Sequence, residues 1–219
     1  MKYIMIQPIL PTLPQPLHIA DKDTALTILT YTVFLALTAM IAFLASQHAA
    51  GHFKGNKKKT ALAFVGISIC FAAVLLCFFG CAVSAVQGIL FCLFLVYSSY
   101  SDIKTRESND CLALMIALTA FIGREVTEIP MMLLSAVLIT IPMFLVLIIC
   151  RGKAVGGADV KLTAACGFLL GISRGTVGLM AGLLIGVIAN LIIQSKKEKQ
   201  EGFPLIPYLA VGFMAAYFL

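Results

Sequence analysis

Two aspartates, Asp102 and Asp159, lie where long apolar segments meet short basic loops. Hydrophobic residues make up 61% of this chain and charged residues only 12%. A carboxylate at the edge of such apolar segments is costly unless it is paired, hydrated or used, and it therefore counts as a candidate functional group. Both aspartates are thus the first candidates for chemistry.

Two carboxylates that face one water molecule can hydrolyse a peptide without a metal or a covalent intermediate. The ionised carboxylate removes the water's proton, and the protonated one donates a hydrogen bond to the scissile carbonyl. Two neighbouring carboxyl groups do not both ionise easily, because their negative charges repel. Such a pair therefore shares a proton and titrates as a unit. Two aspartates on one side of a membrane therefore indicate acid–base chemistry.

Each aspartate is followed two positions later by a lysine. The first stretch reads Ser-Asp-Ile-Lys-Thr-Arg over 101–106, and the second reads Gly-Gly-Ala-Asp-Val-Lys-Leu over 156–162. Small residues before the second aspartate let the backbone bend and let a helix or a substrate approach closely. The residues that support the two motifs are Lys104, Arg106, Gly156, Gly157, Ala158 and Lys161.

Each of these features also has an ordinary structural interpretation. Asp159 is placed to N-cap a helix over 160–171, and Asp102 to be a solvated loop acid beside Lys104 and Arg106. The lysines also fit a purely topological role, because basic residues gather in cytoplasmic loops. The combination and order of the motifs, rather than either motif alone, favours the catalytic interpretation.

The composition predicts an all-α, polytopic transmembrane helix bundle, with residues 1–219 as a single integral membrane domain. The mean hydropathy is +1.02, and apolar runs near the roughly 20 residues needed to cross a bilayer recur along the chain. The net charge of +6 does not indicate nucleic acid, because the basic residues lie in short loops. The seven cysteines show no Cys-x-x-Cys spacing, so we expect buried free thiols, with no metal and no cofactor.

The apolar runs predict about eight membrane segments. Two of them, 111–123 and 159–171, have about 13 residues and cover only roughly 20 Å as helices, which draws the neighbouring aspartates toward the hydrocarbon boundary. Glycines along the last third of the chain predict close helix packing, at Gly171, Gly175, Gly178, Gly182 and Gly186. The eight segments are 24–45, 61–79 and 83–101 around a reversal at 80–84, then 111–123, 131–150, 159–171, 176–193 and 204–219.

The basic residues predict the orientation. If every segment crosses and the loop 46–60 is cytoplasmic, the cytoplasmic side holds Lys54, Lys57, Lys58, Lys59, Lys104, Arg106, Arg151, Lys153, Lys161, Lys196, Lys197 and Lys199, and the other side holds Lys2, Lys22, Arg124 and Arg174. Such a bias is typical of positive-inside topology. It predicts that both termini are outside and that both aspartates face the cytoplasm.

The two aspartate stretches are followed by Phe-Pro-Leu-Ile-Pro-Tyr-Leu-Ala-Val-Gly over 203–212. In this order they resemble the type IV prepilin peptidases, membrane aspartyl proteases with a Gly-x-Gly-Asp motif. The resemblance covers about 83–219, which makes 83–219 the peptidase-like core and 1–82 additional N-terminal membrane segments. In that family both motif aspartates are catalytic, and they correspond here to Asp102 and Asp159.

The resemblance implies a function and partners. The substrate would be a prepilin or pseudopilin precursor whose basic leader is cut from its hydrophobic helix at the cytoplasmic face of the plasma membrane. Membrane lipid would be the other partner, and no nucleic acid is expected. Two departures are Ala158 in place of a motif glycine and Asp110 where an asparagine is frequent. The Cys-x-x-Cys zinc region of larger members is missing from the sequence, so we expect a short form without N-methyltransferase activity.

Two other classes of function remain open from the sequence. A small ion-coupled transporter also uses intramembrane acids and helix breaks with glycine, although both acids here lie toward one face and the two halves show no repeat. A non-catalytic membrane subunit of pilus assembly is the third interpretation. Replacing each aspartate by asparagine separates the three classes.

Overall fold

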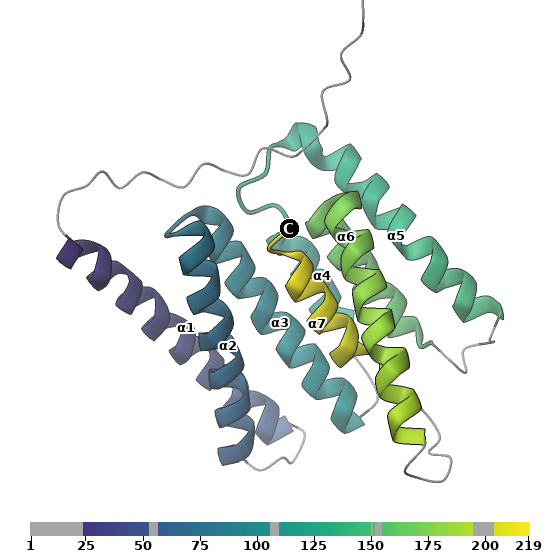
Figure 1. Cartoon of the computed structure of the whole chain (residues 1–219), viewed down its shortest axis with the longest axis horizontal. Helices are drawn as coiled ribbons and strands as arrows, with labels where there is room; N and C mark the ends of the chain where they lie inside the picture. The colour runs from purple at the N-terminus through teal and green to yellow at the C-terminus, as the bar shows by residue number, and fades with distance from the viewer. Residues whose placement is uncertain (1–23, 53–56, 106–109, 150, 152–154, 195–203) are drawn as a thin grey trace, which may run out of the picture.

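The computed structural model describes residues 24–52, 57–105, 110–149, 151, 155–194 and 204–219, and these parts of the chain are helical with no strand. The prediction of an all-α bundle is confirmed (Figure 1). The helices are α1 Thr24–His52, α2 Lys57–Phe79, α3 Val83–Thr105, α4 Asp110–Thr119, the short 3₁₀ helix η1 Val126–Glu128, α5 Ile129–Ile149, α6 Gly157–Gln194 and α7 Ile206–Ala216.

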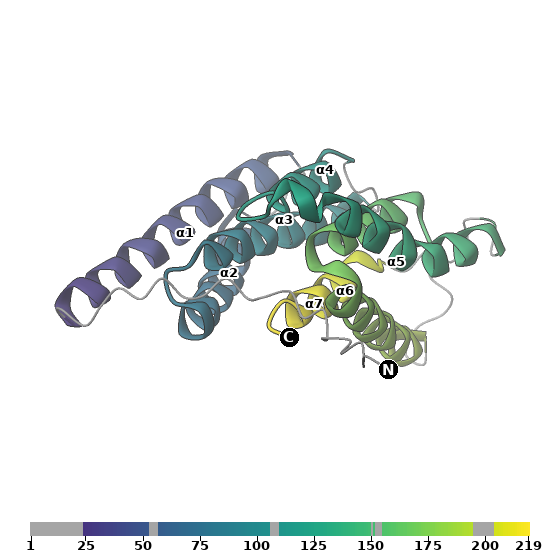
Figure 2. The same ribbon diagram turned by 90° about the horizontal axis from the view of Figure 1, so that it is seen from above.

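The helices form an elongated row when viewed from above, with α1 and α2 toward one end and α5 toward the other (Figure 2). Both α4 and α7 pack against α3 on one side and α6 on the other, and they lie on opposite faces of the row. In Figure 1, α3 ends and α4, α6 and α7 begin toward the lower end of the bundle. This arrangement brings the starts of three helices close to the end of a fourth.

Five helical stretches are long and apolar enough to cross a membrane: 27–52, 57–79, 83–105, 126–149 and 157–192. The chain is therefore a multi-pass membrane protein by length and composition. The remaining apolar helices, α4 and α7, have 10 and 11 residues and are too short to span a bilayer alone. The segment expected over 204–219 is therefore a short helix rather than a full span, and the count of eight crossings stays a prediction.

The long helix α6 folds back on itself at Gly171. This residue has φ 78° and ψ 177°, a left-handed conformation that favours glycine. A side-chain Cβ built on Gly175 would lie 3.5 Å from the Cα of Gly167, whereas eight residues of straight helix span roughly 12 Å. The two segments expected at 159–171 and 176–193 are thus the two arms of a helical hairpin, 157–170 and 172–194.

The basic loop expected over 46–60 is shorter than predicted. Helix α1 continues to His52 and α2 begins at Lys57. The extra helical turns form because Ser46, Ala49 and Ala50 are buried against neighbouring helices, and tertiary packing of this kind stabilises helix beyond its intrinsic propensity. The reversal predicted at 80–84 is confirmed, with Gly80 at φ 61° between α2 and α3.

The second arm of α6 packs on α7 through glycines, as the sequence predicted. A Cβ at Gly182 would meet the Cα of Leu209 at 2.8 Å, and one at Gly178 would meet the ring of Phe213 at 2.7 Å. From the other side, a Cβ at Gly212 would run into the backbone of Gly178 and Gly182. The two helices therefore touch backbone to backbone, which small residues allow in membrane proteins.

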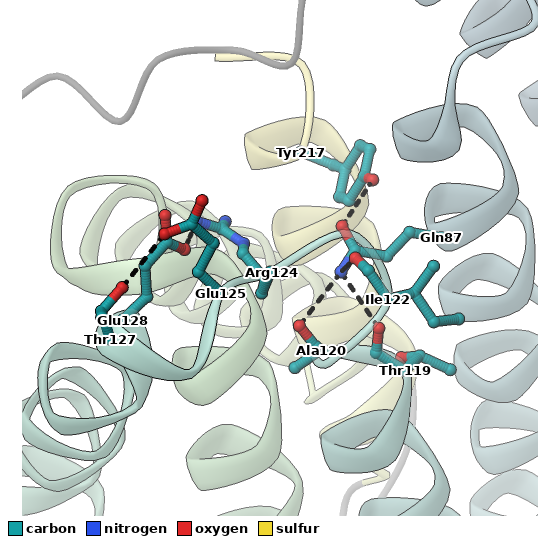
Figure 3. A network of polar contacts seen from close by, with 9 residues as sticks. All are labelled: Gln87, Thr119, Ala120, Ile122, Arg124, Glu125, Thr127, Glu128 and Tyr217. Atoms are coloured by element: carbon teal, nitrogen blue, oxygen red, sulfur yellow. Dashed lines mark hydrogen bonds and ion pairs between the residues drawn. The ribbon is translucent and has the colours of Figure 1, made fainter.

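The buried side chain of Gln87 contacts two other parts of the chain, at the end of the bundle where α7 ends (Figure 3). The Gln87 Nε2 group of α3 lies 3.0, 3.4 and 3.3 Å from the carbonyl oxygens of Thr119, Ala120 and Ile122, where α4 ends. The Tyr217 hydroxyl lies 3.2 Å from the amide oxygen of Gln87. These contacts satisfy helix-end carbonyls that would otherwise be buried without partners.

The cysteines in the described part of the chain are free thiols, as expected. Cys92 and Cys166 are buried, but Cys70, Cys77 and Cys111 are exposed on the protein surface, so the prediction of buried thiols is wrong for these three. The outer faces of α2 and α4 are apolar and present these side chains to the surroundings of the bundle. Cys150 lies outside the described residues.

Candidate active site

Asp102 lies in the last turn of α3 and is only 8% exposed. Its Oδ2 atom accepts a hydrogen bond of 3.2 Å from the backbone N–H of Ile206. Ile206 is the first residue of α7, so this N–H is one of those that a helix start leaves without an internal partner. The positive end of the α7 dipole therefore meets the carboxylate, which offsets its unfavourable place at the C-terminal end of α3.

Asp159 lies in the first turn of α6 and is also 8% exposed. Its Oδ2 atom accepts a hydrogen bond of 2.8 Å from the backbone N–H of Gly156, three residues earlier. Because α6 begins at Gly157, Asp159 lies inside the helix and not at the cap position, and its side chain reaches back as in a capping box. Thr163 donates to the Asp159 carbonyl at 2.7 Å and belongs to the same turn.

The two glycines before Asp159 have different surroundings. A Cβ on Gly156 would lie 3.3 Å from the Oδ2 atom of Asp159, whereas one on Gly157 would meet nothing within 4 Å. Ala158 is half-buried against the apolar core, so its extra methyl group has room. The close approach between carboxylate and backbone therefore depends on the first glycine of the motif.

The aspartates sit on separate helices at one end of the bundle. In the described part of the chain, no Cα atom of α3 lies within 8 Å of one in α6. The helices α4 and α7 pack between them, and each contacts both. The relative position of Asp102 and Asp159 is thus set by α4 and α7 and not by direct packing of their own helices.

One ion pair connects the two motifs. Lys161 Nζ lies 2.6 Å from Asp110 Oδ2, with side chains 57% and 68% exposed. Asp110 begins α4, just after the loop that follows Asp102, and Lys161 is one half-turn beyond Asp159 on α6. The pair therefore links the loop after the first aspartate to the helix of the second. The sequence drew attention to both residues but not to their pairing.

The other residues that support the two motifs and that the structure describes are exposed. Lys104 is exposed near the end of α3, and Gly157 is exposed at the start of α6. Arg106 lies outside the described residues. Within the segments that the structure describes, no three side chains of His, Cys, Asp or Glu gather so that they could bind a metal ion. The candidate site consists of the two buried carboxylates, the N–H of the buried Ile206 and the N–H of the exposed Gly156.

This geometry suits acid–base chemistry. Each carboxylate is largely removed from water, and each receives a backbone N–H that favours its ionised form. Held in fixed orientations by helix starts, the two groups can accept and donate protons at defined positions. The backbone donor of Ile206 was missed by sequence reasoning, although the prolines at 204 and 207 mark a helix start there.

Comparison with known proteins shows what this part of the chain resembles. Residues 89–193, which include both aspartates, match the model of the type IV leader peptidase family. A Bacillus subtilis (strain 168) protein described as a prepilin leader peptidase/N-methyltransferase is 34% identical over 65 residues. That match covers 29% of this chain and 26% of the relative, so it spans about a quarter of that protein. No solved structure matches the chain. The resemblance read from the two motifs is confirmed: residues 89–193, just under half of the chain, resemble the type IV leader peptidase family.

Proposed function

We propose that this protein is a membrane aspartic endopeptidase that removes the basic leader from type IV prepilin-like precursors. The observation that carries the proposal is a pair of buried aspartates at one end of an apolar helical bundle. Asp102 and Asp159 are each held by a backbone N–H, and both lie within the region that matches the leader peptidase family. A buried carboxylate is costly unless it accepts hydrogen bonds, and an acid within apolar segments is a candidate functional group.

The reaction needs one proton on the pair. The ionised carboxylate takes a proton from water, and the water oxygen attacks the carbonyl carbon of the scissile peptide. The protonated carboxyl stabilises the developing oxyanion and then supplies a proton to the leaving amine as the C–N bond breaks. Asp102 and Asp159 act here as a coupled pair, so the base and acid roles belong to the pair.

The bilayer and the charges favour a substrate with a basic leader and an apolar helix. The outward side chains of α5 and the second arm of α6 are largely exposed hydrophobics, which suits contact with lipid. The described basic residues at the end with the aspartates are Lys57, Lys58, Lys59, Lys104, Arg151 and Lys161, against Arg124 and Arg174 at the other end. This bias supports a site on the cytoplasmic face of the plasma membrane.

Of the two activities in the relative's name, we propose only the peptidase for this chain. The larger family members carry paired Cys-x-x-Cys zinc ligands in the region associated with methylation, and these 219 residues contain no such pair. The matched region contains the aspartates of the peptidase site. Incubation with a methyl donor and cleaved substrate is therefore expected to leave the new N-terminus unmodified.

The proposal is tested with purified protein reconstituted in lipid. A prepilin-like peptide with a basic leader and a hydrophobic helix is expected to be cut once, at the junction of the two, as read by mass spectrometry. The matched control peptide carries the same helix without its leader and should stay intact. An uncut panel of such precursors, or cleavage at many sites, would contradict a leader peptidase.

We predict that Gly156→Ala impairs cleavage far more than Gly157→Ala. The added methyl at 156 lies 3.3 Å from Asp159 Oδ2 and must displace the carboxyl or its N–H donor, whereas 157 has open space. A shift of a few tenths of an ångström is expected to lower kcat by about three- to tenfold, since a misplacement near 1 Å costs about a hundredfold. The measurement is kcat for both variants, with Gly157→Ala as matched control. Equal effects of the two substitutions would rule out this steric account.

The ion pair of Asp110 and Lys161 predicts a smaller, coupled effect. Because both side chains are more than half exposed, each of Asp110→Asn and Lys161→Gln is expected to lower kcat/KM by only about two- to fivefold. The double variant should be no worse than either single one, because the same interaction is lost in all three. A full double-mutant cycle of cleavage rates checks this. Additive losses would mean that the two residues act independently.

A further inference from the structure

Two helices that precede the family match contact α3 beside Asp102. The Tyr97 hydroxyl lies 2.9 Å from His48 Nδ1 on α1, and the Tyr100 hydroxyl lies 3.1 Å from Thr60 Oγ1 on α2. Both tyrosines lie on α3 within about one and a half turns before Asp102. The N-terminal helices therefore hold α3 through polar contacts at its site end.

A small apolar cluster packs against these two tyrosines. Phe64 of α2 is 1% exposed, and its ring meets those of Tyr97 and Tyr100 edge to face, with centroids 6.2 and 5.6 Å apart. Ala49 and Cys92 are also buried in this cluster. Edge-to-face rings add a directional attraction to area burial. The contact between α1, α2 and α3 is therefore packed as well as hydrogen-bonded.

The braced face of α3 is opposite the face that carries the aspartate. Tyr100 and Asp102 are two residues apart, which is a rotation of about 200° on an α-helix. Tyr100 contacts Thr60 of α2, whereas Asp102 contacts Ile206 of α7. Figure 1 shows α3 between α2 and α7. The last turns of α3 are thus held between the N-terminal helices and the helix start that binds Asp102.

We propose that α1 and α2 form a brace that positions Asp102, with Tyr97 and Tyr100 as the positioning residues on α3. Helix ends fray, and a carboxylate in a last turn keeps its hydrogen bond to Ile206 only while that turn stays ordered. Hydrogen bonds between side chains of packed helices favour one relative rotation and height of those helices. The Tyr100–Thr60 bond is partly buried and the Tyr97–His48 bond is exposed, so we expect the first to contribute more to the position of α3. The catalytic consequence rests on the proposed peptidase function.

The test is the double variant Tyr97→Phe/Tyr100→Phe in lipid, which keeps both rings and removes both hydroxyls. Its kcat is expected to fall about tenfold while KM changes less than twofold, because the lost hydroxyls face α1 and α2 and not Asp102. Hydrogen–deuterium exchange should rise in the peptide covering 99–105. Tyr31→Phe is the matched control: it removes a hydroxyl from α1 near Gly80, at the other end of the bundle, and should change neither readout.

A second variant acts from outside α3. Thr60→Val keeps the side-chain shape and removes the partner of Tyr100, so it should raise exchange over 99–105 even if the double variant folds poorly. If wild type cleaves and the variants keep its kcat and its exchange, the brace is wrong while the peptidase stands. If wild type cleaves no precursor, the peptidase fails, and the exchange of 99–105 in Thr60→Val still decides whether α2 orders this turn.

Discussion

Asp102→Asn or Asp159→Asn is expected to lower kcat for precursor cleavage by about a thousandfold or more, without loss of the fold. Each substitution removes a proton-transfer group, which is worth about 10²- to 10⁴-fold in rate. Because the two carboxyls share one proton and one water in the proposed mechanism, either change is expected to disable the pair. The double variant is therefore expected to be no slower than the single ones, as in other groups of residues that act as a unit.

Asparagine is the sharp choice because its amide oxygen preserves the local hydrogen bond. In each variant this oxygen can still accept the N–H of Ile206 or of Gly156, at the positions that Asp102 and Asp159 occupy. Thermal unfolding in lipid should therefore match wild type. The control is Glu128→Gln, which changes an acid in an ion pair with Arg124 at the other end of the bundle and should cleave normally.

The same variants separate the other classes of function. A non-catalytic assembly subunit should tolerate both substitutions, and a transporter should lose ion-coupled uptake without ever cutting a precursor. Full cleavage by a folded Asp102→Asn or Asp159→Asn protein would contradict the two-aspartate mechanism. The rates of purified, reconstituted variants on one precursor are sufficient to distinguish these outcomes.

The sequence predicted those features of the fold that depend on local signals. The reversal at Gly80 was recognisable because glycine tolerates the left-handed backbone found there. Gly171 was expected to pack helices closely, but it forms the turn of the α6 hairpin and a Cβ there would meet nothing within 4 Å. The segment expected over 131–150 is α5, which begins at Ile129 with Pro130 in its first turn, where proline fits a helix. The close packing of α6 was predicted from glycines spaced three or four apart, which lie on one helix face.

The parts that sequence reasoning missed depend on long-range contacts. The N–H of Ile206 reaches a carboxylate more than a hundred residues earlier. Since every residue except proline has a backbone N–H, such a donor cannot be recognised from residue type. The pairing of Asp110 with Lys161 and the extension of α1 to His52 likewise follow from how helices pack. The motif aspartates were found because buried charge is rare in apolar segments, whereas their partners are ordinary residues.

The second large effect is expected from Gly212→Val, which should destabilise the protein and reduce cleavage together. A Cβ at 212 runs into the backbone of Gly178 and Gly182, so no side-chain rearrangement can make room and α7 must move away from α6. Overpacking of this kind costs about 1–3 kcal/mol, and more where backbone must shift. The measurement is thermal unfolding in lipid alongside kcat.

The loss of activity follows from the position of α7 and not only from stability. Gly212 lies six residues along α7 from Ile206, whose N–H binds Asp102. A displaced α7 therefore moves that donor away from the carboxyl. Gly66→Val is the matched control, because a Cβ there meets nothing within 4 Å and should leave both unfolding and cleavage near wild type. One outcome is that Gly212→Val lowers the unfolding temperature and still keeps full kcat below that temperature. In that case the glycine contact between α6 and α7 stabilises the bundle without positioning Asp102. If both fall together at temperatures where the protein is folded, the glycine contact between α6 and α7 holds Asp102 in place for cleavage.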